Sequence, residues 1–435
     1  EISACLVGSE MCIRDSFDAL HDPESVAFAR VETVLRAHPE VTLACIAYVN
    51  ADELITLSLL ASPSVHVHGS AKTQLEQMCE ALWAILEHRD PMTMPLHLTS
   101  LANPHPQPMS TDMPKGMAGE RLEDQFLRRA QDIPHVPALT CCTSVSPPTF
   151  VSWSYQELDT RSNEIAQLLW SCGVGYAAAQ SDDDQVIVLC MAKCMDMYAA
   201  ILGVLKAGAT WCPIDPGWPS SRQSALLIKS GARVALTTGA EAPMVESSCP
   251  EHMQVVRLDR PFPSLTSLPP RTAERSSASH LAYKIWTSGT TGLPKAVGVE
   301  HIAAVQGMRA LQKAVPTDMD APVRPGAIRY LQFAAYVFDL SIFDIFYAWG
   351  HGGTVCFAPL DLLLTRLVDV ANALQVTHTL LTPAVSAMVP RRAIPTMQVM
   401  INGGEKLSQV VADDWTQEGC RVVNIYGPAE ATLSL

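Results

Sequence analysis

Residues 287–295 combine glycines, hydroxyl side chains and one lysine in the order TSGTTGLPK. Glycine lets backbone N–H groups approach an anion closely, hydroxyl groups add donors, and lysine supplies a charge suited to phosphate. Residues 282–286 before this segment have the composition of a strand, and residues 297–299 after it are also β-like. His301 then opens an amphipathic helical run. We therefore predict a phosphate-holding loop that follows a strand.

The spacing of this loop excludes two familiar phosphate-binding patterns. A Walker loop requires G-x-x-x-x-G-K-[ST], whereas Gly289, Gly292 and Lys295 follow the pattern G-x-x-G-x-x-K. The segment does not match the dinucleotide pattern G-x-G-x-x-G either. A Thr/Gly turn between two strands, without any ligand, remains the alternative interpretation.

Composition limits the class of protein. A length of 435 residues predicts two or three domains, and the net charge of −14 argues against nucleic acid or an anionic membrane as a partner. No apolar run approaches the ~18 residues of a membrane span, and no signal peptide is evident. The thirteen cysteines contain no C-x-x-C pair, so reduced thiols are favoured over a zinc site. We expect a cytoplasmic protein.

Strand-like and helix-like segments alternate in the larger part of the chain. Strands are predicted at residues 186–190, 234–237 and 355–357, with helices at 121–130 and 197–206. This order is typical of an α/β fold with a largely parallel sheet. Two clusters receive a structural interpretation: residues 181–184 as a solvated loop and residues 350–353 as a tight turn.

The chain divides by composition into four parts. Residues 1–16 include CLVGSEMCIRDS, which resembles a translated sequencing adapter, so we expect the native sequence to begin near Phe17; a ragged terminus is the alternative. Residues 17–100 contain two predicted strands, 41–49 and 54–60, and a helical pattern from Leu75 to Leu86. Residues 101–116 are predicted to be a linker, and residues 117–435 form the main domain.

Five ordered blocks resemble the AMP-forming adenylation family, which includes nonribosomal peptide synthetase adenylation domains, acyl-CoA synthetases and luciferases. The blocks are WSYQEL at 153–158, LKAG to PIDP at 205–216, TSGTTGLPK at 287–295, FDLS at 338–341, and NGGE with NIYGPAE at 402–405 and 424–430. The resemblance implies the large N-terminal subdomain of such an enzyme, with largely parallel sheets flanked by helices. Because the chain stops at Leu435, we expect the small C-terminal lid subdomain to be absent.

The resemblance implies that ATP and Mg²⁺ are used to convert an amino acid into an aminoacyl-adenylate. Nucleotide binding is assigned by motif position to Thr287, Ser288, Gly289, Thr290, Thr291, Gly292, Lys295, Gly403, Gly404, Glu405, Asn424, Tyr426 and Gly427. Lys295 and Glu430 would be catalytic, and Glu430 would also bind the metal. The alternatives are core packing for Tyr426 and a surface position at a helix start for Glu430. Ala429 departs from the Thr or Ser usual in the family.

By the same resemblance, Asp339 would hold the α-ammonium group of the substrate. The alternative for Asp339 is a helix N-cap. The whole substrate site would consist of Asp339, Leu340, Phe343, Leu380, Ile401, Gly403, Ile425, Leu433 and Ser434. Apart from Asp339, this set carries no charge or amide, which favours a hydrophobic or small neutral amino acid.

The resemblance also implies partners. The product would pass to a phosphopantetheinylated carrier domain, and residues 17–100 would be the tail of an upstream condensation domain. A carboxylate–CoA or aryl ligase on the same scaffold is a second hypothesis, and a non-catalytic nucleotide-binding remnant is a third. Without the lid, we expect the chain alone to be weakly active or inactive.

Overall fold

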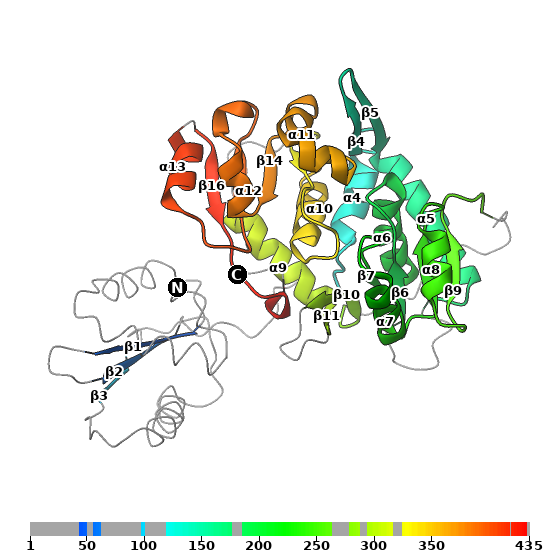
Figure 1. Cartoon of the computed structure of the whole chain (residues 1–435), viewed down its shortest axis with the longest axis horizontal. Helices are drawn as coiled ribbons and strands as arrows, with labels where there is room; N and C mark the ends of the chain where they lie inside the picture. Colours follow the sequence, from blue (N-terminus) through cyan, green and yellow to red (C-terminus); the bar gives the residue numbers. More distant parts are fainter. Residues whose placement is uncertain are drawn as a thin grey trace. The chain divides into compact units, whose positions relative to one another are not determined.

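The computed structural model describes three strands among residues 43–100 and six stretches of the remaining chain: 119–175, 185–262, 278–287, 294–315, 324–417 and 419–432 (Figure 1). The chain divides into two compact units, Glu1–Lys115 and Gly116–Leu435. The predicted adapter-like segment 1–16, the helical pattern after Leu75 and the linker 101–116 lie outside the described residues.

The first unit contains a three-stranded sheet. It consists of β1 (Leu43–Val49), β2 (Ile55–Ala61) and β3 (His97–Ser100), in that order. β1 and β2 are antiparallel, whereas β2 and β3 are parallel. β1 and β2 confirm the two strands predicted at 41–49 and 54–60.

The second unit contains a six-stranded sheet with the order β11-β10-β7-β6-β8-β9. Its strands are β6 (Val186–Leu189), β7 (Thr210–Pro213), β8 (Val234–Thr237), β9 (Gln254–Arg257), β10 (Leu281–Thr287) and β11 (Lys295–Glu300). Every neighbouring pair is parallel except β10–β11, which is an antiparallel hairpin at one edge.

A seven-stranded sheet in the same unit has the order β16-β15-β14-β12-β13-β4-β5. Its strands are β4 (Pro137–Val145), β5 (Pro148–Ser154), β12 (Arg329–Leu331), β13 (Thr354–Phe357), β14 (His378–Leu381), β15 (Val399–Asn402) and β16 (Arg421–Asn424). Only the β4–β5 hairpin is antiparallel. The predicted α/β class with largely parallel sheets is therefore confirmed.

Helices flank the two sheets (Figure 1). They are α4 (Asp124–Asp132), α5 (Tyr155–Ser171), α6 (Met195–Ala207), α7 (Ser220–Ser230), α8 (Ala242–Ser248), α9 (His301–Ala314), α10 (Leu340–Gly350), α11 (Leu360–Ala373), α12 (Pro383–Met388) and α13 (Gln409–Gln417), with 3₁₀ turns η2 (Arg391–Ala393) and η3 (Ala429–Ala431). No helix among the described residues is both long and apolar enough to cross a membrane.

The predicted helix at 121–130 has the wrong start, because α4 begins at Asp124. The Arg121 N–H group donates to Asp124 Oδ2 at 3.1 Å, and the Asp124 N–H group donates to the Arg121 carbonyl at 3.0 Å. These two hydrogen bonds give the N–H and carbonyl groups of Arg121, just before the helix, their hydrogen-bond partners, as a helix cap does. The predicted turn at 350–353 is confirmed, and Gly352 adopts a φ of 69° there.

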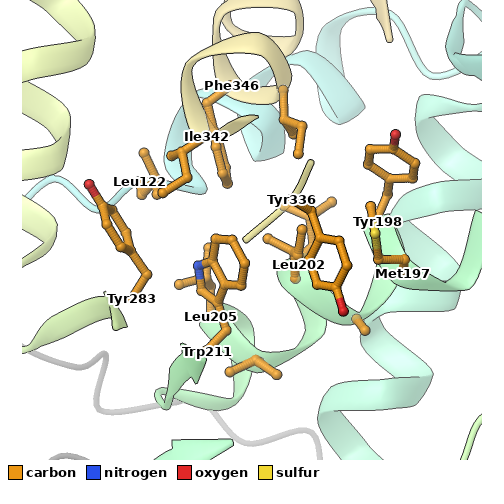
Figure 2. Packing of buried hydrophobic residues seen from close by; sticks show 14 of the residues in the cluster. Leu122, Met197, Tyr198, Leu202, Leu205, Trp211, Tyr283, Tyr336, Ile342 and Phe346 are labelled. Atoms are coloured by element: carbon orange, nitrogen blue, oxygen red, sulfur yellow. The ribbon is translucent and has the colours of Figure 1, made fainter. Parts of the chain in front are cut away.

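Two helices, α6 and α10, are buried on almost all sides. Ten of the thirteen residues of α6 and nine of the eleven of α10 are buried, as expected for helices that are apolar around their whole circumference. Figure 2 shows Met197, Leu202 and Leu205 of α6 with Ile342 and Phe346 of α10 in one apolar cluster. In the same cluster, Trp211 of β7 and Tyr283 of β10 link these helices to the six-stranded sheet.

The close approach of α5 and α6 depends on Gly203. A Cβ atom at this position would lie 2.7 Å from Ile165 Cγ2 and 3.0 Å from the Ser162 carbonyl oxygen. We expect Gly203→Ala to lower the free energy of unfolding by about 1–3 kcal/mol, since overpacking outweighs a helix-propensity gain of at most ~1 kcal/mol. Urea denaturation of the chain followed by circular dichroism measures this change.

The Ile165→Ala variant provides the control for this prediction. It removes the nearest clashing atom, so the double variant should be less destabilised than the sum of the two single variants. Equal or greater stability of Gly203→Ala relative to wild type would show that the helices can separate without cost.

Candidate functional site

The predicted phosphate loop connects the two strands of the β10–β11 hairpin. Thr287 at the end of β10 is paired with Lys295 at the start of β11, and Lys295 is exposed. The Lys229 ammonium of α7 donates to the Pro294 carbonyl at 2.5 Å, which holds the loop at its last residue. Ser288, Gly289, Thr290, Thr291 and Gly292 lie outside the described residues. The loop thus joins strand to strand, whereas a Walker loop leads into a helix.

The 3₁₀ turn η3 brings Glu430 to this hairpin. η3 contacts β11, the strand that begins with Lys295. Glu430 is exposed, and its charge adds to a rise in the pKa of Asp339 whose main cause is burial. Lys295 and Glu430, which are far apart in the sequence, are therefore carried by neighbouring elements.

Asp339 occupies the N-cap position of α10. Its Oδ1 atom accepts a hydrogen bond from the Leu340 N–H group at 2.9 Å. Burial raises the pKa of Asp339, Glu430 adds to this shift, and backbone hydrogen bonds oppose it. Burial raises the pKa of the Tyr283 hydroxyl on β10, and the charge of Asp339 adds to this shift. Asp339 therefore does occupy the N-cap position of α10, and the hydrogen bond from Leu340 uses one of its two carboxylate oxygens.

The apolar side chains assigned to the substrate pocket lie on adjoining elements. Leu380 of β14 is paired with Ile401 of β15, and the Ile425 N–H group, just beyond β16, donates to the Asn402 carbonyl at 2.7 Å. Phe343, Leu380, Ile401 and Ile425 are all buried in one cluster, and Leu340 packs against it. Leu433 and Ser434 lie outside the described residues.

Glycine is present at the two positions of the G-G-E block for different structural reasons. A Cβ atom on the buried Gly403 would lie 2.9 Å from Ile425 Cγ1, so packing of the apolar cluster explains this glycine. Gly404 is exposed, adopts a φ of 83°, and has open space where a side chain would be. Only Gly404 therefore offers bare, exposed backbone. Glu405 is anchored, because its Oε2 atom accepts from the Ala384 N–H group at 3.0 Å.

The residues assigned to adenine follow the end of β16. Asn424 is exposed, and Tyr426 has 56% of its surface accessible to solvent. Core packing, the alternative interpretation of Tyr426, is therefore wrong. Gly427 is half-buried and leads to η3.

Sequence reasoning missed a buried polar group behind Asp339. Asp344 of α10 has no exposed surface, and it interacts with the Gln332 side chain and with the charge of Lys193. The signal that could have revealed Asp344 is an acidic residue within the apolar stretch LSIFDIFYAWG, because a buried carboxylate requires partners.

The motif position assigns a metal to Glu430 alone, and this assignment stays a prediction. The described part of the chain contains no group of three or more His, Cys, Asp or Glu side chains that could surround an ion. Nine cysteines in this part are free, as expected for reduced thiols. A single carboxylate suits Mg²⁺, which is commonly held by one or two carboxylates together with substrate phosphates.

Comparison with known proteins shows the family of this chain. Residues 126–435 match the family model described as AMP-binding enzyme. The ferrichrome siderophore peptide synthetase of Mycosarcoma maydis is 42% identical over 422 residues, which cover 92% of this chain and 10% of that protein. The chain thus spans about a tenth of this relative, and the similarity extends ahead of residue 126.

Two solved structures share the fold. A crystal structure of the nonribosomal peptide synthetase FmoA3 matches 73% of this chain and 32% of its own, with a TM-score of 0.60 and 23% identity. The Klebsiella oxytoca NpsA N-terminal subdomain, in complex with 3-hydroxybenzoyl-AMSN, matches 72% of this chain and 73% of its own, with a TM-score of 0.57 and 20% identity. The match to the family model and the shared fold lead to one conclusion: the chain belongs to the AMP-binding enzyme family.

Proposed function

We propose that this chain activates an α-amino acid as an aminoacyl-adenylate with ATP, as the adenylation domain of a nonribosomal peptide synthetase. The observation that carries the proposal is the position of Asp339. Its carboxylate lies at the start of α10, directly before Leu340, which packs against the apolar cluster of Phe343 and Leu380, and the charge of Glu430 acts on it. An ammonium group beside this carboxylate places the rest of an amino acid between apolar side chains and the hairpin that carries Lys295.

The proposed reaction is the attack of a substrate carboxylate oxygen on the α-phosphorus of ATP. The new P–O bond gives the acyl-adenylate, and pyrophosphate leaves with the electron pair of the broken P–O bond. Such chemistry depends on positioning and on neutralising phosphate charge. Lys295 supplies positive charge at the loop that starts at Thr287, and Glu430 would hold Mg²⁺, which neutralises phosphate charge when bound.

The adenosine moiety would lie against the segment after β16. Tyr426 presents an exposed ring for stacking, Asn424 an exposed amide, and Gly404 open backbone. These three residues lie next to η3 or β15, the elements that also carry Glu430 and Ile401. The nucleotide and the amino acid would then meet between Glu430 and Asp339.

The substrate class and the partners follow from the same site and from the relatives. The buried side chains of the pocket are apolar, which favours a hydrophobic or small neutral amino acid. The relative at 42% identity is a siderophore peptide synthetase, which supports transfer to a phosphopantetheinylated carrier domain and a condensation domain upstream. Residues 17–100 would belong to that condensation domain, 101–116 to a linker and 117–435 to the adenylation domain, in the cytoplasm.

Activation of an aryl or other simple carboxylic acid is a second candidate. The NpsA structure that shares this fold contains a 3-hydroxybenzoyl compound, which has no α-ammonium group. The Asp339 carboxylate argues against such a substrate here, because a buried carboxylate without a cationic partner is costly. The experiment below distinguishes the two classes of substrate.

We expect Asp339→Asn to abolish the preference for α-amino acids. Asparagine keeps an acceptor for the Leu340 N–H group but loses the charge that would pair with an ammonium group, a loss of about 2–5 kcal/mol at a water-shielded site. Pyrophosphate exchange by the full-length gene product would be measured with a panel of amino acids and their desamino analogues. ATP binding, measured separately, should be unchanged.

Asp339→Ala controls for the capping role, because it removes both the charge and the cap. It should lower stability by about 0.5–2 kcal/mol relative to Asp339→Asn, since asparagine is as good an N-cap as aspartate. An Asp339→Asn enzyme with unaltered amino acid preference would refute the ammonium site, and absence of exchange with every acid in wild type would favour a non-catalytic remnant.

We expect Lys295→Ala to weaken productive use of ATP without loss of the fold. Lys295 is exposed at the start of β11, so its removal leaves no cavity, yet it takes away the cation of the loop. The kcat/KM for ATP in pyrophosphate exchange should fall, while the unfolding curve stays unchanged. Lys313→Ala, an exposed lysine in the last turn of α9, is the matched control; equal effects of the two substitutions would contradict the assignment.

A further inference from the structure

The segment that leads from β12 to Asp339 is fastened by buried polar groups that the proposed function does not use. β12 ends at Leu331 and α10 begins at Leu340, so residues 332–339 form the connection. This connection has no regular structure to fix its shape, and its last residue is the proposed ligand of the substrate ammonium. The side chains that hold it therefore decide where the Asp339 carboxylate lies.

Lys193 holds the first part of the connection. It lies in the turn between β6 and α6, and its ammonium donates to the Gln332 carbonyl at 3.1 Å and to the Phe333 carbonyl at 2.9 Å. Lys193 is half-buried, and burial lowers its pKa to about 7. The charge of Asp344 opposes that shift.

Gln332 joins three elements through its side chain. Its Oε1 atom accepts from the Tyr198 hydroxyl of α6 at 3.0 Å, and its Nε2 atom donates to the Ala334 carbonyl at 2.6 Å and to Asp344 Oδ2 at 3.3 Å. Asp344 lies in α10, five residues after Asp339. Burial raises the pKa of Asp344 to about 7, and the nearby Tyr330 hydroxyl, the charge of Lys193 and the Gln332 side chain oppose this shift.

Tyr336 holds the second part of the connection to the six-stranded sheet. Its hydroxyl lies 2.8 Å from the Ile214 carbonyl after β7 and 3.2 Å from the Leu189 carbonyl at the end of β6. The same hydroxyl accepts from the Met191 N–H group at 3.3 Å. Figure 2 shows Tyr336 and Tyr198 within the apolar core, where such bonds are shielded from water. Tyr336 and Lys193 thus tie the connection to the β6–α6 region at two points.

We propose that Lys193 is a positioning residue that holds the 332–339 connection so that Asp339 faces the substrate ammonium. Lys193 touches neither substrate nor nucleotide in this role and acts through the backbone of Gln332 and Phe333. The inference rests on the proposed function, because it concerns the placement of Asp339. Small displacements of a positioned group are costly, with a 1 Å error worth on the order of 100-fold in rate.

The test compares Lys193→Met with a matched buried lysine. Lys206, at the other end of α6, donates to Asp159 Oδ1 at 2.6 Å and to Ser162 Oγ at 2.6 Å, with no contact to the connection. Lys193→Met should reduce the ratio of kcat/KM for an α-amino acid to that for its desamino analogue by about 10- to 100-fold. The KM for ATP should stay unchanged, and Lys206→Met should lower stability without changing the ratio.

The double variant Lys193→Met with Asp344→Asn separates positioning from stability. The second substitution removes the Asp344 charge that Lys193→Met leaves buried, so the free energy of unfolding should recover relative to Lys193→Met. The hydrogen bonds to the Gln332 and Phe333 carbonyls are still missing in the double variant, so the ratio of the two kcat/KM values should stay low. Tyr198→Phe, which frees Gln332 without stranding a charge, should shift the ratio in the same direction if Lys193→Met does not fold. A folded double variant with the wild-type ratio, or an equal loss in Lys206→Met, overturns the inference.

Asp339→Asn is measured in parallel, so that failure of the proposed function is recognised separately. If Asp339→Asn keeps the wild-type ratio, the ammonium site is wrong. The role of Lys193 in holding the connection is then tested by amide hydrogen exchange of residues 332–340. This exchange should be faster in Lys193→Met and unchanged in Lys206→Met. Unchanged exchange in Lys193→Met would show that Lys193 does not hold the connection, whatever the substrate.

Discussion

Burial of α6 and α10 in one apolar cluster is the constraint on which the rest of the second unit depends. Neither helix has a polar face to present to water, so each must be covered by other elements. The strands β7 and β10 supply part of that cover through Trp211 and Tyr283. The N-terminus of α10, and with it Asp339, is thereby held beside the β10–β11 hairpin.

The same burial makes the polar groups within the core costly unless they are paired. Asp344 on α10 has no exposed surface, and Lys193 precedes α6, so the two central helices bring opposite charges together inside the protein. Gln332 and Tyr198 satisfy part of the remaining hydrogen-bonding capacity. The apolar contacts fix where the helices lie, and the polar contacts select one conformation for the connection between β12 and α10.

The site is assembled from chain segments that are short in sequence and distant from one another. Lys295 belongs to β11, a strand at the edge of the six-stranded sheet. Ile401 lies in β15 of the seven-stranded sheet, and Glu430 follows β16 of the same sheet. Contact between η3 and β11 joins the two groups.

The sequence by itself determined the local elements and their order. Apolar runs bounded by turns predicted β6, β8 and β13 to within one residue, because strand formation there depends on neighbouring residues. The ordered blocks from residue 153 to residue 430 also predicted the family. The start of α4 was missed, since it depends on a hydrogen bond from the Arg121 backbone N–H group to the Asp124 carboxylate that has no periodic signature.

Only the tertiary structure decided which residues meet and why some of them are present. Gly403 is required by the approach of Ile425, a contact between two strands that no local pattern encodes. Tyr426 is exposed although its neighbour Ile425 is buried, because β16 ends at the sheet edge just before them. The hydrogen bonds from Lys193 to the Gln332 and Phe333 carbonyls likewise exist only once the turn before α6 meets the connection after β12, because these residues are distant in the sequence.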